Sequence, residues 1–223
     1  AGLFGSYANP DLKPEKSTSF EIGIKQGYKF GNLMGYLDIA GFYQRYENTI
    51  EYLFGVWDPT FTVAGFKFVN TGRSRVRGID ASIVGMTDEK KNFRVNYMVG
   101  YTYVDPKTLD PDYNYAQMKN TSGEYIDVYL NYNTTSEDTT NHTLKYRFNH
   151  MLKGHLEFSY KKWSVGFSYR YYSRMKNIDK AIRELEYVTE TGNKFLDEIK
   201  YTKFWEAHNG QHIFDARLAY KLS

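Results

Sequence analysis

The chain contains no cysteine, which excludes disulfides, thiolate metal sites and cysteine nucleophiles. Proline is scarce, with five residues, and this fits long strands that few prolines interrupt. No apolar run approaches the length of a transmembrane helix, and the mean hydropathy is −0.63. A hydropathy scan therefore predicts a soluble protein, but that scan fails for β-barrels, whose strands place only alternate residues in lipid.

Neither sign of charge dominates. Lys and Arg total 29 against 26 Asp and Glu, a formal net charge of +3 without a basic stripe, so we expect no nucleic-acid partner. The histidines show neither HExxH spacing nor a paired nucleophile motif; they are His142, His150, His155, His208 and His212. We therefore expect no enzyme, no catalytic residue, no metal site and no cofactor.

Aromatic residues are abundant, at 18% of the 223 residues, and such a load suits strands better than helices. The clearest pattern is strict alternation over residues 19–30, which places Phe20, Ile22 and Ile24 on one face. A period of two indicates a strand. A short turn at Gly31-Asn32 leads to a second alternating run over residues 37–46, and together the runs predict a hairpin of unusually long strands.

Further alternating runs bring the expected strand count to about seven. These runs cover residues 66–86 (interrupted around Gly72 and 73–78), 93–103, 142–160, 163–171 and 211–222. Most exceed the average soluble strand of roughly 5–6 residues and fit a tilted membrane strand of roughly 9–11. Their apolar face is aliphatic in the middle and aromatic at the ends, the arrangement of a membrane barrel with aromatic girdles.

The connections alternate between very short and long. Short turns are expected at 31–32, 87–91 and 161–162, and long loops at 49–65, 105–141 and 176–210. In an antiparallel meander all the long loops share one side, which is the asymmetry of extracellular loops and periplasmic turns in an outer-membrane barrel. We expect a strand extension at 125–132 and a short amphipathic helix around 178–185 within these loops.

The face opposite the apolar one carries charges of both signs, which suits a wide lumen holding water or a polar plug. The predicted lumen-lining residues are Glu21, Lys25, Asp38, Arg94, Arg147, Glu157, Arg170, Asp215 and Arg217. We expect the last three arginines to form cross-strand ion pairs with Glu157 or Asp215. His155 is placed on this lumenal face, and His150 on the lipid-facing register near the middle of a strand.

One segment closely resembles the conserved start of a barrel strand in TonB-dependent outer-membrane receptors: Asn9-Pro10-Asp11-Leu12-Lys13-Pro14-Glu15-Lys16-Ser17. The resemblance continues in register over residues 19–25. A weaker one follows at Asn70-Thr71-Gly72 leading into Gly78-Ile79-Asp80, and a loose one at residues 147–150. We therefore expect an all-β fold, a partial transmembrane antiparallel up-and-down barrel with about seven strands of roughly 22.

The resemblance implies active uptake of a scarce ligand, such as an iron–siderophore, haem, cobalamin or a glycan, across the outer membrane of a Gram-negative bacterium. It implies outer-membrane lipid, the protein's own plug domain and the TonB complex as partners, the last through an N-terminal segment not present here. Residues 1–223 are then one barrel fragment without plug, earlier strands or last hairpin. The absent signal peptide and the non-aromatic end at Leu222-Ser223 fit this interpretation.

Loop aromatics are the candidate ligand contacts, because loops on a rigid scaffold carry specificity. These are Trp57, Tyr113, Tyr115 and Trp205. His208, and beside it His212, are candidate contacts to haem or a metal complex. Three rival functions stay open: a passive porin-like channel, a barrel protease or lipase, and a soluble β-rich binding or adhesion domain.

Overall fold

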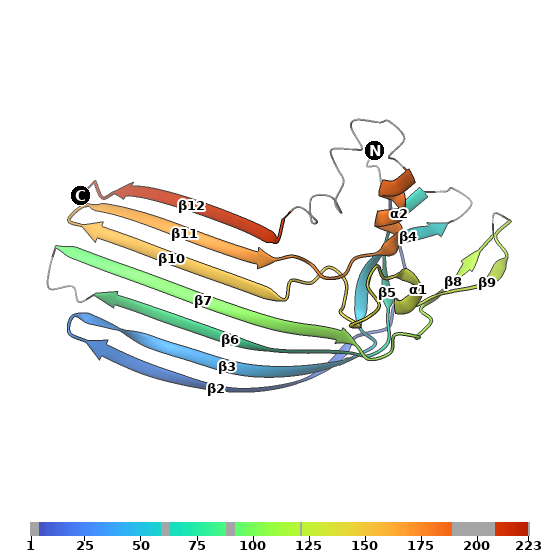
Figure 1. The fold of residues 1–223 in the computed structure, drawn as a ribbon, viewed down its shortest axis with the longest axis horizontal. Helices are drawn as coiled ribbons and strands as arrows, with labels where there is room; N and C mark the ends of the chain where they lie inside the picture. The colour runs from blue at the N-terminus through green and yellow to red at the C-terminus, as the bar shows by residue number, and fades with distance from the viewer. Residues whose placement is uncertain (1–4, 59–62, 88–91, 121, 189–207, 223) are drawn as a thin grey trace.

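The computed structural model describes residues 5–58, 63–87, 92–120, 122–188 and 208–222. A large antiparallel sheet of long strands makes up most of it, and short strands and helices gather at one end of that sheet (Figure 1). We call this end layer the cap; it comprises the described residues within 5–15, 48–73, 109–149 and 174–188. Among the described residues, no helix is long and apolar enough to cross a membrane.

The long sheet is a meander of seven strands in the order β12-β11-β10-β7-β6-β3-β2. The strands are β2 Lys16–Phe30, β3 Leu33–Glu47, β6 Ser74–Thr87, β7 Phe93–Thr108, β10 His150–Tyr160, β11 Trp163–Ser173 and β12 Gly210–Tyr220. The expected strand number and length are therefore confirmed. Seven strands are fewer than the roughly eight of the smallest closed barrel, so the sheet is one part of a wall.

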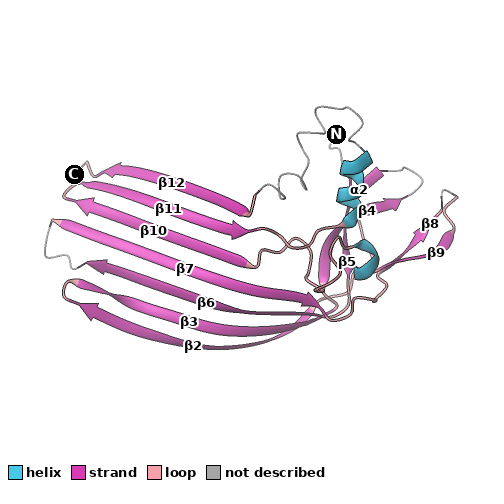
Figure 2. Cartoon of the chain, viewed as in Figure 1, coloured by secondary structure: helices cyan, strands magenta, loops and turns pink. Residues whose placement is uncertain are grey.

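The short turns lie at the end of the sheet away from the cap (Figure 2). Gly31 adopts φ +58°, and Lys161 adopts φ 52° in the turn between β10 and β11, so both hairpins reverse over two residues, as expected. The third short turn falls largely on residues 88–91, outside the described residues. The described parts of the long connections lie at the cap end.

The cap has its own secondary structure. β1 Gly5–Tyr7, β5 Val63–Asn70 and β4 Ile50–Asp58 form a three-stranded sheet in that order, and β8 Ala116–Lys119 pairs with β9 Tyr125–Leu130. Two helices follow, α1 Tyr132–Thr135 and α2 Lys180–Val188. β9 and α2 confirm the expected strand extension and helix. The buried apolar core of the described residues lies here, in Leu53, Phe54, Val69, Tyr132, Leu144 and Ile178.

Two sequence expectations were wrong about where barrel strands begin. The expected loop at 49–65 holds most of the β4–β5 hairpin. Residues 66–70 belong to β5 in the cap and not to a barrel strand, because the chain turns at Gly72, which adopts φ +88°. The strand expected over 142–160 begins only at His150, because His142 and Tyr146 adopt positive φ and break the ladder. His150 therefore lies at a strand end, not in the middle.

The two faces of the long sheet differ as the alternation predicts. Ile22, Ile24 and Leu218 are 82%, 73% and 67% exposed on the face that we call the exterior. Apolar side chains exposed in continuous rows mark a surface that meets an apolar partner. The opposite face, which we call lumenal, carries charged residues such as Glu21, Lys25 and Asp38.

Candidate functional site: the lumenal wall and the cap cavity

The lumenal wall carries opposite charges in pairs. Lys25 Nζ lies 3.6 Å from Asp38 Oδ2 on the neighbouring strand, and Arg170 Nη2 donates to Asp215 Oδ2 at 3.0 Å. Arg217 pairs with Glu157 across β11, where Gly166 leaves the room between them. The expected ion pairs of Arg170 and Arg217 are confirmed. The wall is therefore a polar surface on which these three pairs neutralise each other.

A hollow of about 390 Å³ lies on this wall between β2 and β10. Its polar lining comes from five strands and includes Glu21, Asp38, Asp80, Thr102 and Lys153. Arg94 lies near the short-turn end, opposite Ser159 in register. His155 Nδ1 lies 3.0 Å from the Ser168 hydroxyl on the neighbouring strand.

The expectation for Arg147 was wrong. This residue precedes β10, and its Nη2 lies 3.7 Å from Glu51 Oε1 in the cap instead of pairing with Glu157 or Asp215. The irregular backbone at 142–149 moves the residue off the barrel ladder. Arg147 therefore links the barrel to β4.

A buried ionic network holds the cap together. Lys145 and Asp179 side chains are each 1% exposed, and Lys145 Nζ donates to Asp179 Oδ1 at 2.5 Å. The other Asp179 oxygen accepts from the Tyr146 hydroxyl and from the Phe54 backbone N–H, both at 2.7 Å. The network joins β4, the 145–147 segment and the start of α2. Alternation and spacing carry no signal for it, because its members are far apart in sequence.

Glu51 adjoins this network and is itself buried. Burial raises the pKa of Glu51 to about 7, although Arg147 and Lys145 act in the opposite direction. A carboxyl in such a setting is partly protonated near neutral pH.

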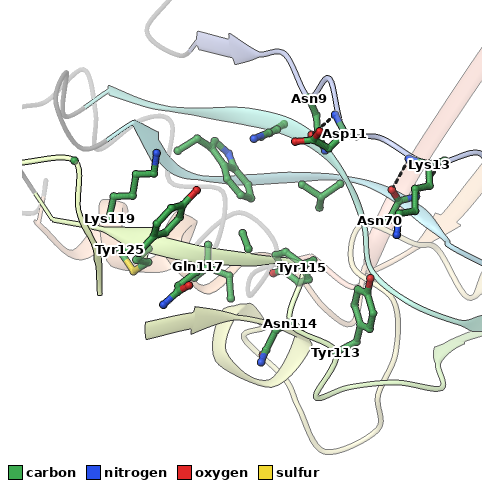
Figure 3. A pocket seen from close by; sticks show the side chains of 17 residues that line it. Asn9, Asp11, Lys13, Asn70, Tyr113, Asn114, Tyr115, Gln117, Lys119 and Tyr125 are labelled. Atoms are coloured by element: carbon green, nitrogen blue, oxygen red, sulfur yellow. Dashed lines mark hydrogen bonds between the residues drawn. The ribbon is translucent and has the colours of Figure 1, made fainter. Parts of the chain in front are cut away.

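A cavity of about 570 Å³ opens in the cap between the β4–β5 hairpin and the β8–β9 hairpin (Figure 3). Three of the predicted ligand contacts line it together: Trp57, Tyr113 and Tyr115. Trp205 lies outside the described residues, and His208 does not line the cavity. Polar side chains that were not predicted as ligand contacts complete the lining; they include Asn9, Asp11, Lys13, Lys67, Asn70, Asn114, Gln117 and Lys119.

The aromatic rings of this cavity are fixed by contacts. Trp57 Nε1 donates to the Gly65 carbonyl at 3.0 Å, and Lys67 Nζ lies 5.7 Å from the indole ring. The Tyr115 hydroxyl lies 2.7 Å from Thr135 Oγ1, and burial raises the pKa of Tyr115. The opposite rim is formed by Tyr125, over whose ring Lys119 Nζ lies at 4.7 Å.

The two sequence motifs meet at one end of the cavity. The Asn70 side chain accepts from the Lys13 backbone N–H at 2.8 Å and donates to the Lys13 carbonyl at 2.9 Å. Asn9 Nδ2 donates to the Phe68 carbonyl at 2.9 Å. The asparagines of both motifs thus act structurally, since they clamp the N-terminal segment onto β5.

The long open sheet, apolar outside and ion-paired inside, defines part of a transmembrane β-barrel. A family model described as TonB dependent receptor-like, beta-barrel, matches residues 1–223. The chain belongs to the TonB-dependent receptor family, as its motifs predicted, and it is outer-membrane barrel wall of that family.

Among solved structures, the chain is similar to the copper transporter OprC, with 13% sequence identity and a TM-score of 0.48. The match covers 96% of this chain and 24% of that one, so the chain spans about a quarter of the transporter's length.

Proposed function

We propose that this chain supplies the wall and the ligand-capturing cap of an active, TonB-dependent transporter in the outer membrane of a Gram-negative bacterium. In this arrangement the cap is extracellular and the short turns are periplasmic. The observation that supports it most is the aromatic and polar cavity built at the cap end, above a lumenal wall that carries cross-strand ion pairs.

The wall and the energy-coupling machinery have separate roles. The cap binds the ligand, and the lumenal wall, with its cross-strand ion pairs, provides a polar surface along which a plug domain and a passing ligand lie. The TonB complex acts through the plug, so we assign no TonB contact to this chain.

The chemistry of the cavity favours a polar ligand with a flat apolar face. Trp57, Tyr113 and Tyr125 offer ring surfaces, and surrounding amides and ammonium groups offer hydrogen bonds. A glycan or an iron–siderophore combines these properties. Haem and cobalamin stay within the proposal as scarce ligands of the same uptake route.

Uptake in cells carrying or lacking the full-length gene tests this proposal. Cells are grown on iron–siderophore, haem, cobalamin or glycans as single sources, with and without the TonB system. We expect deletion to abolish TonB-dependent uptake of one ligand class. Uptake that continues without TonB would contradict the proposal and favour a passive channel.

A matched pair of cavity variants locates the ligand site. Tyr125 and Tyr129 both lie exposed on β9, but only Tyr125 lines the cavity. We expect Tyr125→Ala to weaken ligand binding by about ten-fold, the loss of one stacked ring and its contacts, and Tyr129→Ala to leave it unchanged. Equal effects of the two variants on ligand binding would show that the ligand does not bind in this cavity.

A further inference from the structure

The exterior face is interrupted by a groove near the cap end of the sheet. Ile22, Gly41 and Ile79 occupy one register row across β2, β3 and β6. Because the middle residue has no side chain, a groove of about 690 Å³ opens between its neighbours, lined also by Phe20, Tyr43 and Arg77. A Cβ added at Gly41 would have only the Gly78 carbonyl oxygen near it, at 4.0 Å, so the groove is a free apolar volume.

Four cations lie on the same face at the cap end of this groove. Arg45, Arg75 and Lys107 occupy one register row of β3, β6 and β7, and Arg77 lies one step nearer the groove. We call these residues the basic cluster. Like charges opposite one another on neighbouring strands repel. The sheet therefore places three cations where a neutral wall would be more stable.

One carboxylate faces the basic cluster. Asp105 Oδ2 lies 3.0 Å from Arg77 Nε and 3.4 Å from Arg75 Nη2, and Asp105 Oδ1 lies 3.9 Å from Lys107 Nζ. Among the described residues, Arg45 has no carboxylate within ion-pair distance. Four cations against one carboxylate leave a net charge of +3, since 4 − 1 = 3.

The neighbouring charged residues do not cancel this excess. Arg73 holds Asp110 in a bidentate pair, with Nη2 2.6 Å from Oδ1 and Nε 2.9 Å from Oδ2. Glu47 lies opposite Lys16 in register at the end of β3. Arg73 and Lys16 add two positive charges and Asp110 and Glu47 two negative ones, so the excess of +3 at this end of the face is unchanged. The basic cluster can therefore bind an additional anion.

We propose that the groove and the basic cluster form one binding site for a phosphorylated, acylated lipid of the outer leaflet. An acyl chain occupies the groove beside Ile22 and Ile79, and the phosphate lies on Arg45, Arg75, Arg77 and Lys107. Guanidinium groups bind phosphate through paired, charge-assisted hydrogen bonds. The site lies on the lipid-facing side, so a lipid reaches it without leaving the membrane. The orientation rests on the proposed function, which places the cap outside the cell.

Lipid binding to the full-length receptor tests this proposal. The purified, delipidated protein is titrated with bis-phosphorylated lipid A and with its dephosphorylated form, and bound lipid is followed by native mass spectrometry. Arg45→Gln removes no ion pair of the protein, so we expect unchanged or higher stability without lipid, together with about ten-fold weaker binding of the phosphorylated lipid. If Arg45 only stabilised the fold, Arg45→Gln would lower stability and lipid binding together.

Two further variants complete the test. Gly41→Leu fills the groove and is expected to weaken the binding of both lipids. Lys153→Gln removes a cation from the lumenal face and is expected to weaken the binding of neither lipid. Unchanged binding in Arg45→Gln and Gly41→Leu would overturn the proposal, as would full displacement of the lipid by inorganic phosphate. This assay measures lipid binding and does not depend on uptake. If the full-length protein proved to be a passive channel, the proposed function would be refuted, but the lipid-binding result would still hold.

Discussion

The long sheet and the cap are stabilised in opposite ways. In the sheet, the apolar side chains point outward and charges such as Arg170 and Asp215 are solvated pairs, 44% and 57% exposed. In the cap, apolar residues are buried, and the ion pair of Lys145 and Asp179 is fully buried with them. The stability of the sheet thus depends on its hydrogen-bond ladder and on lipid. The stability of the cap depends on a buried apolar core that also contains one charged network, whose desolvation costs free energy. The four predictions below test this contrast.

Breaking the buried pair should have the largest effect. Asp179→Asn leaves the Lys145 ammonium buried without its ion-pair partner, which costs about 3–5 kcal/mol. We expect faster amide exchange in β4 and α2 and unchanged exchange in β10 and β11. Lys180→Gln is the matched control, because the Lys180–Glu184 pair is 55% and 65% exposed. Equal loss of protection in the cap and the sheet would show that the two regions unfold together.

A charge introduced on the exterior face should destabilise the sheet more the deeper it lies in the bilayer. Ile24→Arg, in the middle of β2, is expected to cost about 2–4 kcal/mol in a bilayer, and Phe30→Arg, at the end of the same strand, about 0–1 kcal/mol. Denaturant unfolding of the full-length protein in lipid vesicles measures both. Similar costs at the two positions would contradict a membrane-embedded exterior face.

The stability of the cap should depend on pH through Glu51. Burial raises its pKa from 4.5 to about 7, so between these values the folded cap binds more protons than the unfolded cap. Cap stability is therefore expected to fall as pH rises from 4.5 to about 7 and then to level off. Amide exchange in β4, corrected for intrinsic rates, measures this slope. In Glu51→Gln the slope should disappear; if it persists, another group is responsible.

Breaking a lumenal pair should have the smallest effect. Asp215→Asn removes the exposed partner of Arg170 and is expected to cost about 0.2–1 kcal/mol, an amount that high salt abolishes. Unfolding in vesicles at low and high salt measures it. A loss as large as that of Asp179→Asn would mean that the lumenal face is dry in the assembled barrel.

Much of the sheet was predictable from local patterns. Alternation located the strands around Ile22, Val99 and Leu218, and the turns Gly31-Asn32 and Lys161-Lys162 marked the hairpins correctly. Binding candidates were predictable only as a class, since loop aromatics were expected at ligand sites. Trp57, Tyr113 and Tyr115 do share one cavity, but spacing could not indicate which of them meet.

The errors concentrate in the cap. Residues 66–70 alternate like a barrel strand but pair with β4, because alternation reports a half-buried strand without naming its partner. Arg147 was expected to pair with Glu157 or Asp215 because its neighbours alternate, but it pairs with Glu51, and the positive φ of Tyr146 left no trace in the pattern.

The sequence by itself determined the strands, their lipid-facing side, the two-residue turns and the receptor family, because these depend on a period of two and on short contiguous motifs. Only the tertiary structure decided the partner of each cap segment, the Lys145–Asp179 network, the cap cavity and the basic cluster at the end of the Gly41 groove. The physical reason is that these features join residues from separate strands and loops, and a contact between distant segments is set by register and packing.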